Sequence, residues 1–481
     1  MPNALKVLFV AAEADPFIKV GGLGDVAGSL PRALHALTHD FTGGIDVDVR
    51  LVLPLHTMVR TESATLRPTV TFRLTRTGSK ELVQIFETSL DGVPVYFVAG
   101  DPINQNGAVY SSNAALDGEK YAFFSLAVLE MLPHLGWQPD ILHANDWHTA
   151  LTVYALGIRR QKNEFPGTCS VLTVHNLPFM GPDLAPRLAA YGLPLVTSGL
   201  PKWARAMPLP LGLWSADAIV GVSPTYAREI LTPEYGAGLE GFLQTRSDVL
   251  HGILNGIDTK SFDPATDETL AFTFKTDNVS MRMLNKKALQ VRMDLKKDPR
   301  IPLLAMVSRM DPQKGVDLAL NALRLLGDLP WQVVILGTGD PTLESHARLL
   351  QADFSEQVRV ETRYDATLAR QIYGGADILL MPSRYEPCGL AQMIAMRYGC
   401  LPLVRATGGL KDTVIPDQTG FMFDGNTAEA LAAAIRKAIA LYPDRERWQA
   451  MQKTAMSQDF SWERSARRYF NLYQSLLSHR S

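Results

Sequence analysis

The chain has 481 residues, of which 46% are hydrophobic and 20% charged, and its formal net charge is -2 at pH 7. This length exceeds what one hydrophobic core usually organises, so the sequence predicts two domains. The balance of charge provides no basic field for nucleic acid or for an anionic membrane, and any anion must therefore be bound by local groups.

The three cysteines and the apolar segments indicate the compartment. Cys169, Cys388 and Cys400 show neither paired spacing nor a metal-ligand pattern, which predicts buried thiols in a reducing environment. No secretory leader opens the sequence, and no apolar run reaches the length of a membrane span. We therefore expect a cytoplasmic protein.

The first predicted element is a buried strand over 5–12, and a helix is predicted over 26–37. Between them, residues 19–26 read K-V-G-G-L-G-D-V. Glycines let the backbone approach a phosphate closely, and a helix start offers unpaired N–H groups and a partial positive charge. This segment is predicted to be an anion-binding loop.

Two other interpretations of this region are disfavoured. Residues 22–27 also fit the dinucleotide pattern G-x-G-x-x-G/A, but residues 13–21 separate them from the strand, and the second strand, 47–53, lacks an acid at its end. Asp46 and Asp48 form a D-x-D pair of the kind that can bind a divalent cation. Alternation of apolar and polar residues over 46–53 instead favours an ordinary strand.

Apolar strands recur along the rest of the chain, with helical patterns such as 121–132 and 149–160 between them. Their arrangement predicts α/β wrapping around parallel sheets, with a domain boundary near 256–264. Two doubly wound domains that face each other would place the carboxyl ends of both sheets across one cleft. The further predicted strands are 82–87, 94–98, 140–143, 170–174, 218–222, 302–307, 331–336, 376–381 and 401–404.

The loops after these strands carry glycines, histidines, cations and carboxylates, and here the sequence resembles the bacterial glycogen and plant starch synthases. The resemblance covers nearly the whole chain. It rests on eight motifs in order: K-x-G-G-L-x-D at 19–25, N-D-W-H at 145–148, H-N-L at 175–177, V-S-P-T-Y-A at 222–227, L-N-G-I-D at 254–258, S-R-x-x-x-Q-K-G at 308–315, E-P-C-G-L at 386–390 and T-G-G-L at 407–410.

This resemblance implies two facing Rossmann-like domains, the GT-B glycosyltransferase architecture. An N-terminal, acceptor-binding domain would span 1–257, a nucleotide-sugar-binding domain 258–460, and a C-terminal helix within 461–481 would cross back to the first domain. The implied reaction is retaining transfer of glucose from ADP-glucose to the nonreducing 4-hydroxyl of an α-1,4-glucan. It would need no metal or other cofactor, and its partners would be these two substrates.

The resemblance also implies four catalytic-site residues. Arg309 and Lys314 would neutralise the departing diphosphate, the task that a metal ion performs in other transferases. Glu386 would hold sugar hydroxyls near the anomeric carbon, although a glutamate near a helix start can also be a simple electrostatic partner. His148 would contact the transferred glucose, in the first turn of a helix capped by Asn145 or Asp146.

In the first domain, Lys19 would approach the sugar diphosphate while Gly21 and Gly22 present N–H groups to it. Asp25 would either meet the donor or cap the following helix. Asn255 would lie near the glucosyl site, or belong to an ordinary Asn-Gly turn.

In the second domain, the backbone of Thr407, Gly408 and Gly409 would form another phosphate cradle at a helix start. Tyr364 would stack on the adenine, but the arginine at 363 stands where many relatives have glycine.

Two departures bear on the acceptor and on the activity. H-N-L continues as Pro-Phe-Met-Gly at 178–181, where Ala-Tyr-Gln-Gly is usual, which leaves the acceptor contacts open. Position 394 is Ile where related transferases have a second glutamate, which argues against sucrose-synthase-like or trehalose-forming activity. Three hypotheses remain: a glucan synthase, a transferase of the same fold that makes another glucoside, and a noncatalytic sugar-binding protein. Retention could use a covalent intermediate or front-face attack, and the absence of an evident carboxylate pair favours the latter.

Overall fold

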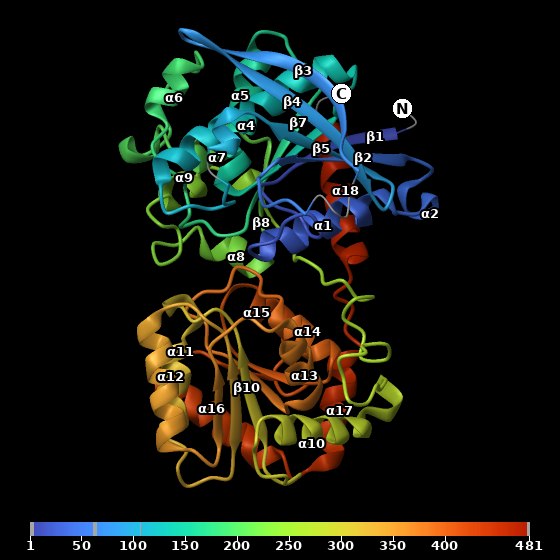
Figure 1. Cartoon of the computed structure of the whole chain (residues 1–481), viewed down its shortest axis with the longest axis vertical. Helices are drawn as coiled ribbons and strands as arrows, with labels where there is room; N and C mark the ends of the chain where they lie inside the picture. Colours follow the sequence, from blue (N-terminus) through green and yellow to red (C-terminus); the bar gives the residue numbers. More distant parts are fainter. Residues whose placement is uncertain (1–3, 61–64, 106, 479–481) are drawn as a thin grey trace. The chain divides into compact units, whose positions relative to one another are not determined.

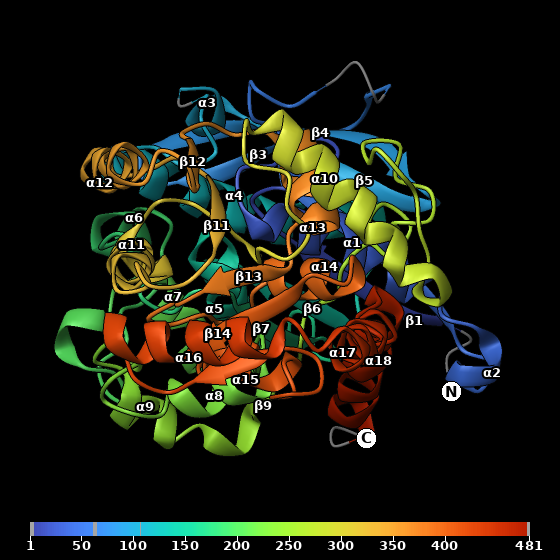
Figure 2. The same ribbon diagram turned by 90° about the horizontal axis from the view of Figure 1, so that it is seen from below.

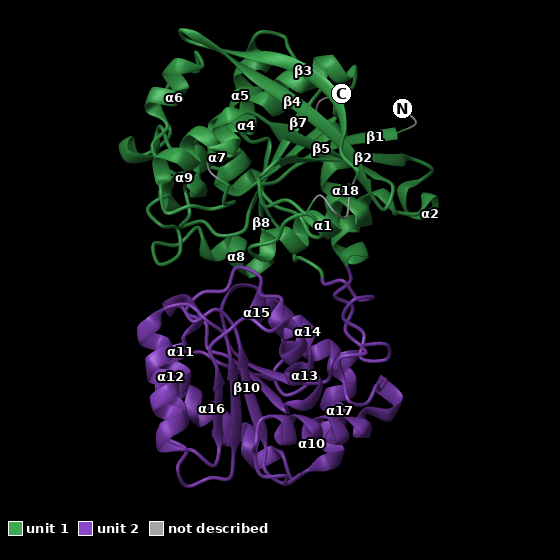
Figure 3. Ribbon diagram, in the orientation of Figure 1, with its two compact units in different colours: residues 1–256, 462–481 green, residues 257–461 purple. Residues whose placement is uncertain are grey.

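The computed structural model describes residues 4–60, 65–105 and 107–478. The chain divides into two compact units (Figure 3). Unit 1 comprises residues 1–256 and 462–481, and unit 2 comprises residues 257–461. Each unit is an α/β layer structure of its own, which confirms the expected class of two Rossmann-like domains.

Unit 1 is built on a nine-stranded sheet in the order β3-β4-β5-β2-β1-β6-β7-β8-β9 (Figure 1). From β5 to β9 in this order all neighbours are parallel. β6 is buried throughout, and β2 is buried from Leu51 to Pro54. The strands are β1 (Ala4–Val10), β2 (Asp46–Pro54), β3 (Arg67–Arg76), β4 (Ser79–Leu90), β5 (Val93–Ala99), β6 (Ile141–Asn145), β7 (Cys169–Val174), β8 (Ala218–Gly221) and β9 (Leu250–Gly252).

The edge of this sheet differs from the all-parallel expectation. β4 pairs antiparallel with both β3 and β5. β3 and β4 are joined by Thr77 and Gly78, and Gly78 has a φ of 79°. A two-residue turn can only connect antiparallel strands, and its backbone favours glycine at positive φ. β3 was not predicted, because its mostly exposed polar side chains give no apolar run.

Helices cover both faces of the sheet in unit 1. α4, α5 and α7 pack together on one face, whereas α1 and α18 pack together on the other. The helices are α1 (Gly22–His35), α2 (His39–Thr42), α3 (Asp101–Asn104), α4 (Ala114–Leu135), α5 (Asp146–Gln161), α6 (Ala185–Ala190), α7 (Pro208–Ser215), α8 (Pro224–Glu229), α9 (Glu240–Gln244) and α18 (Trp462–Ser478).

The C-terminal helix α18 belongs to unit 1, as the predicted return of the chain requires. Its Tyr473 hydroxyl lies 2.7 Å from Nδ1 of His143 in β6, and Nε2 of the same imidazole lies 2.7 Å from Thr173 Oγ1 in β7. The His143 ring is fully buried. A buried polar group is stable only with its partners in place, so this chain of bonds fixes the helix on the sheet.

Unit 2 has a six-stranded, wholly parallel sheet in the order β12-β11-β10-β13-β14-β15. The central strands were predicted, whereas β12 and β15, only four and three residues long, were not. The strands are β10 (Leu303–Val307), β11 (Gln332–Leu336), β12 (Val358–Glu361), β13 (Ile378–Met381), β14 (Leu401–Arg405) and β15 (Phe421–Phe423).

The helices of unit 2 form two groups on opposite faces of its sheet. α11, α12 and α16 form one group, and α10, α13, α14 and α17 form the other; Figure 2 shows the same separation from below. The helices are α10 (Arg282–Arg292), α11 (Val316–Arg324), α12 (Pro341–Asp353), α13 (Ala366–Gly375), α14 (Ala391–Arg397), α15 (Gly408–Thr413), α16 (Ala428–Leu441) and α17 (Arg445–Met456).

Replacing His143 with Gln should change how stability depends on pH. Burial lowers the pKa of His143 from 6.5 to about 3. Below pH 6.5 the unfolded chain therefore binds a proton at this residue that the folded protein excludes, and stability falls by about 1.4 kcal/mol per pH unit from this residue alone. We expect the free energy of unfolding, measured with urea, to fall less steeply in His143→Gln than in the natural protein as the pH is lowered from 6.5 to 5.

Tyr473→Phe is the matched control, because it removes the hydroxyl partner but leaves the imidazole buried. It should lower stability and retain the slope of the natural protein. Equal slopes for the His143→Gln variant and the natural protein would contradict the assignment.

Candidate active site

In unit 1, the glycine loop leads from β1 into the start of α1. Lys19 Nζ lies 2.5 Å from Oδ1 of Asp25, which is in the first turn of α1. The N-cap residue is Gly21, and no side chain caps the helix. Asp25 therefore pairs with Lys19 and does not serve as the N-cap. Burial raises the pKa of Asp25, and the Lys19 ammonium opposes this effect.

The two neighbouring glycines of this loop differ. The Gly21 N–H donates to the Glu13 carboxylate, with distances of 3.2 Å to Oε1 and 3.1 Å to Oε2. A Cβ added at Gly22 would meet nothing within 4 Å. The expectation that both glycines offer free N–H groups to a ligand is therefore not met at Gly21 in this structure, whereas Gly22 borders open space.

His148 lies in an aromatic pocket at the start of α5. Its ring centroid is 4.1 Å from that of Trp147, 4.7 Å from that of Tyr121 and 4.8 Å from that of Tyr110. Burial lowers the pKa of His148 well below its ordinary value, so the imidazole is neutral at neutral pH. Its Nδ1 has no hydrogen-bond partner within the described part of the chain. His148 therefore retains an unused polar atom beside the aromatic rings.

The residues before His148 join two strand ends. Asn145 Oδ1 lies 3.0 Å from His175 Nε2, and Asp146 Oδ1 accepts the His175 N–H at 2.7 Å. Asn145 is the N-cap residue of α5, one of the two expected, but its side chain makes no capping hydrogen bond. Asp146 has a φ of 55°, and burial raises its pKa to about 7. Strain and a perturbed carboxyl in one residue are typical of functional sites, and Asp146 adds to the predicted set.

Asn255 follows β9 and is buried. Its Oδ1 has no hydrogen-bond partner among the residues that the structure describes. Such an amide oxygen is costly unless a ligand or water satisfies it, which makes Asn255 a candidate contact.

In unit 2, the loops after β10 and β13 are joined by an ion pair. Lys314 Nζ lies 2.9 Å from Oε1 and 2.7 Å from Oε2 of Glu386, and the Ser383 hydroxyl donates to Oε2 at 2.9 Å. The Glu386 residue is only 4% exposed. A cavity of about 110 Å³ is lined by these three side chains together with Gly389 and Leu390. Among the described residues, Lys314 and Glu386 are the only two predicted catalytic residues in direct contact with each other.

Arg309 lies on the same loop as Lys314 but differs in exposure. Its guanidinium Nη2 lies 3.2 Å from Asp311 Oδ2, and its side chain is 67% exposed. The Asp311 carboxylate also accepts the Lys314 N–H at 3.1 Å, which fixes the turn. Arg309 is therefore a solvated cation that is available to an anionic ligand.

The loop that opens α15 packs directly on the backbone of Glu386. Gly409 N–H donates to the Glu386 carbonyl oxygen at 3.0 Å. Gly408 has a φ of 45°, and an added Cβ would lie 1.9 Å from that same oxygen. Thr407 is the N-cap residue and is fully buried. The glycines of this predicted phosphate cradle thus also allow the loop to reach Glu386, and the Gly409 N–H is already engaged.

Tyr364, the predicted adenine partner, lies beyond β12 and is 84% exposed.

The D-x-D aspartates of β2 have protein partners. Asp46 lies 2.6 Å from His39 Nε2, and Asp48 accepts the Trp137 indole N–H at 2.8 Å. Within residues 4–60, 65–105 and 107–478, no three His, Cys, Asp or Glu side chains are grouped as a metal site requires.

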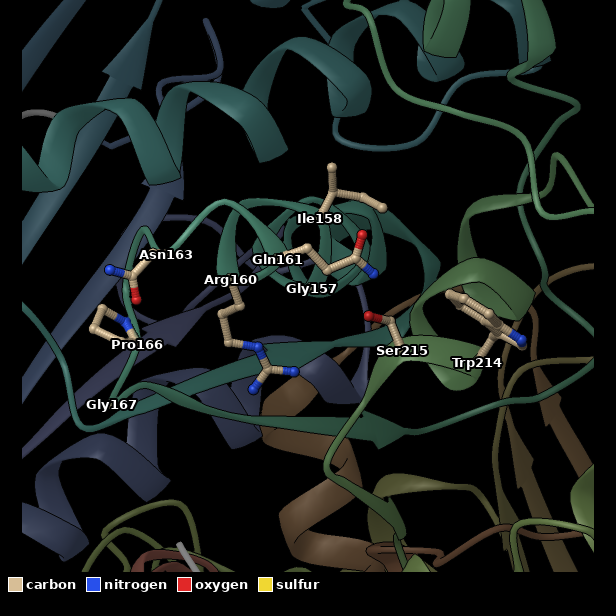
Figure 4. Close-up of a pocket in the computed structure, with 9 residues that line it drawn as sticks. All are labelled: Gly157, Ile158, Arg160, Gln161, Asn163, Pro166, Gly167, Trp214 and Ser215. Atoms are coloured by element: carbon tan, nitrogen blue, oxygen red, sulfur yellow. The ribbon is translucent and has the colours of Figure 1, made fainter.

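A wider pocket of about 710 Å³ lies apart from these residues in unit 1 (Figure 4). Trp214 and Ser215 line it together with Arg160, whose guanidinium is paired with Asp217 at 2.6 Å. None of the predicted site residues lines this pocket.

The fold and these polar loops define the class. Two Rossmann-like α/β units, with glycine-rich loops and paired cations and carboxylates at strand ends, are the architecture of a GT-B glycosyltransferase.

Comparison with known proteins identifies the family. Residues 6–245 match the model of the starch synthase catalytic domain, and residues 290–454 match glycosyl transferases group 1. A glycogen synthase of Clostridium beijerinckii is 38% identical over 486 residues, covering 98% of this chain and 99% of that protein. A glycogen synthase of Thermotoga maritima is 39% identical, with the same coverage of each.

Solved structures agree with this result. The catalytic domain of starch synthase IV from Arabidopsis thaliana, bound to ADP and acarbose, has a TM-score of 0.88 and 33% identity, covering 99% of this chain and 100% of that one. Sucrose-phosphate synthase from Thermosynechococcus elongatus shares the fold, with a TM-score of 0.62 and 20% identity. The chain belongs to the glycogen and starch synthase family. It is a glycosyltransferase of the glycogen synthase type.

Replacing Gly408 with Ala should damage the site through Glu386. The new Cβ would meet the Glu386 carbonyl oxygen in a backbone conformation that disfavours a side chain, at a cost of about 2–4 kcal/mol. We expect a lower melting temperature and a loss of turnover larger than the unfolded fraction explains.

Gly136→Ala is the matched control. Gly136 also has positive φ, 58°, but an added Cβ there would meet nothing within 4 Å. It should lose about 1 kcal/mol of stability and keep its turnover. Equal effects of the two substitutions on turnover would contradict the steric argument.

Proposed function

We propose that this chain transfers glucose with retention from ADP-glucose to the nonreducing 4-hydroxyl of an α-1,4-glucan, with Lys314 and Glu386 at the chemical centre. The observation that carries this proposal is their contact: one ammonium bound to both oxygens of one buried carboxylate, beside a small cavity. Such a pair offers a positive group for a departing phosphate and a negative group for a sugar that develops positive charge.

The donor diphosphate would be neutralised by cations. Arg309 is solvated, and Lys314 is fixed by Glu386, so the first can move to the phosphates while the second is already placed. Lys19 supplies a third cation, and the start of α1 at Gly22 adds backbone N–H groups. These groups do what a divalent cation does elsewhere, and no metal is needed in this scheme.

The adenosine would contact unit 2. We propose that Tyr364 stacks on the adenine, for which its exposed ring is free, and that the turn of Thr407, Gly408 and Gly409 borders the phosphates. The relative solved with ADP supports binding of an adenine nucleotide, and we propose residues 258–460 as the domain that binds it.

Glu386 is better suited to stabilising the sugar than to attacking it. Both of its oxygens are bound by Lys314, and Oε2 also accepts from Ser383. These bonds lower the nucleophilicity of the carboxylate. We therefore favour front-face attack: the bond from the acceptor oxygen to the anomeric carbon forms, the bond from that carbon to the phosphate oxygen breaks on the same face, and the departing phosphate takes the hydroxyl proton.

The acceptor would bind unit 1, in the proposed acceptor domain 1–257. A pocket of about 570 Å³ is lined by Trp147, Phe179 and Trp203, and the latter two are 59% and 51% exposed. Aromatic rings bind the apolar faces of sugars with a small loss of conformational entropy. His148 packs on Trp147 and would contact the transferred glucose, with Asn255 as a second polar contact. Acarbose in the starch synthase relative supports a glucan-like ligand.

No helix in the described residues is long and apolar enough to cross a membrane. Cys169, Cys388 and Cys400 are buried and form no disulfide bond. Such thiols suit a reducing compartment, so we propose that the enzyme acts in the cytoplasm.

The substrates can be tested directly with the purified protein. ADP release from ADP-glucose should rise strongly when glycogen is added, because positioning of the acceptor supplies much of the acceleration. The polymer should gain α-1,4-linked glucose. Glycogen-independent turnover with a small acceptor would instead indicate a transferase that makes another glucoside, and binding without turnover would indicate a noncatalytic protein.

A double-mutant cycle tests the central ion pair. Glu386→Ala should lower kcat by about 100-fold or more while ADP affinity stays equal or increases, since Lys314 is then released. Lys314→Ala should lower both kcat and ADP affinity. The double variant should lose less than the product of the two single losses, because the residues act together.

Lys437→Ala is the control for loss of a lysine in unit 2, because Lys437 pairs with Asp417 on the surface. It should leave ADP affinity unchanged. Multiplicative losses in the cycle, or unchanged ADP affinity in Lys314→Ala, would defeat the proposed roles.

A further inference from the structure

Glu13 was not singled out by the sequence, yet the glycine loop is organised around it. This residue follows β1 and is fully buried. Its carboxylate accepts the backbone N–H groups of Val20 and Gly21 and the Tyr110 hydroxyl, the last at 2.8 Å. Three donors from two distant segments therefore converge on one side chain.

The bonding resembles the way in which a loop holds a phosphate. Successive backbone N–H groups around one anion form an anion-binding concavity. Here the anion is a side chain of the protein itself. Burial raises the pKa of Glu13, and the N–H of Val20 together with the hydroxyl of Tyr110 opposes that change.

The packing shows that Glu13 is a fixed part of the loop. A Cβ added at Gly24 would lie 3.2 Å from Glu13 Oε2 and 3.0 Å from Lys19 Cγ, and one added at Gly21 would lie 3.4 Å from Glu13 Oε1. Two of the loop glycines thus make room for this carboxylate and for the stem of Lys19. Gly22 alone among the three has open space beside it.

We propose that Glu13 is a positioning residue that, with Tyr110, holds the loop of residues 19–25 in the conformation that binds the donor diphosphate. The carboxylate takes the amides of Val20 and Gly21, which leaves the helix start at Gly22 to face the ligand, beside Lys19 and its partner Asp25. Tyr110 also packs on His148, with ring centroids 4.8 Å apart, so the tyrosine that binds Glu13 also supports the histidine. This inference rests on the proposed role of the loop in donor binding.

The test compares Glu13→Gln and Tyr110→Phe in the full-length protein. Gln keeps the size of the side chain but replaces one accepting oxygen with a donor, and Phe removes only the hydroxyl. We expect the KM for ADP-glucose and the Kd for ADP, measured by calorimetry, to rise about tenfold or more in Glu13→Gln and by less in Tyr110→Phe. The value of kcat at saturating donor should stay within about threefold, because neither residue touches the reacting atoms.

Glu130→Gln is the matched control for loss of a carboxylate in unit 1, because Glu130 pairs with Arg159 at 2.6 Å. It should leave both donor constants unchanged. If Glu13→Gln does not fold, Tyr110→Phe still decides the question, because its ring and its packing on His148 are kept.

Lys19→Ala distinguishes the role of the loop in donor binding from the positioning role of Glu13. Weaker ADP binding in Lys19→Ala with unchanged binding in folded Glu13→Gln and in Tyr110→Phe would overturn the positioning role and leave the proposed function intact. Unchanged ADP binding in Lys19→Ala would overturn the role of the loop itself, and the positioning role with it.

Discussion

The contact between Lys314 and Glu386 is the interaction on which the arrangement of unit 2 depends. It joins the loops after β10 and β13, which are adjacent strands of the parallel sheet. Other loops at this edge approach one another as closely as backbone permits. A Cβ at Gly315 would lie 2.1 Å from the Pro382 carbonyl oxygen, and one at Gly337 would lie 1.8 Å from that of Ser308. Glycine there is a requirement of packing, and the packing keeps the buried Glu386 carboxylate in contact with the partly buried Lys314 ammonium.

Unit 1 also holds buried carboxylates at the ends of its strands, but their partners differ from those in unit 2. A carboxylate at the end of β1 is satisfied by main-chain N–H groups and a tyrosine, and a second one, Asp146, at the end of β6 accepts N–H groups from the segment after β7. Buried charges are tolerated only when donors surround them. Both carboxylates are held at the same edge of the sheet, and the neutral ring of His148 packs close to the first through Tyr110. The polar groups of this edge therefore support one another across segments far apart in sequence.

Local pattern was enough for the main strands and for the motifs, because buried parallel strands form apolar runs and the loops after them are short. It was not enough for β3, whose side chains are largely solvated, nor for the antiparallel pairing that its hairpin imposes. No local pattern marks Glu13 as a functional residue, because its partner Tyr110 is 97 residues away and the loop amides carry no sequence signal. The sequence predicts Asp146 only as a possible helix cap, because its burial and its bond to the His175 N–H depend on a segment 29 residues away. The engagement of the Gly21 N–H depends on a tertiary contact that no local pattern encodes.

The return of the chain at α18 affects how the protein is made. Unit 1 consists of two stretches, 1–256 and 462–481, with all of unit 2 between them. Synthesis runs from the N-terminus, and domains tend to fold as they emerge. The side of β6 and β7 that receives Tyr473 must therefore wait, with Nδ1 of His143 lacking this partner, until α18 has left the ribosome. Unit 2 can be complete while unit 1 still lacks a buried partner, so unit 1 finishes folding after unit 2.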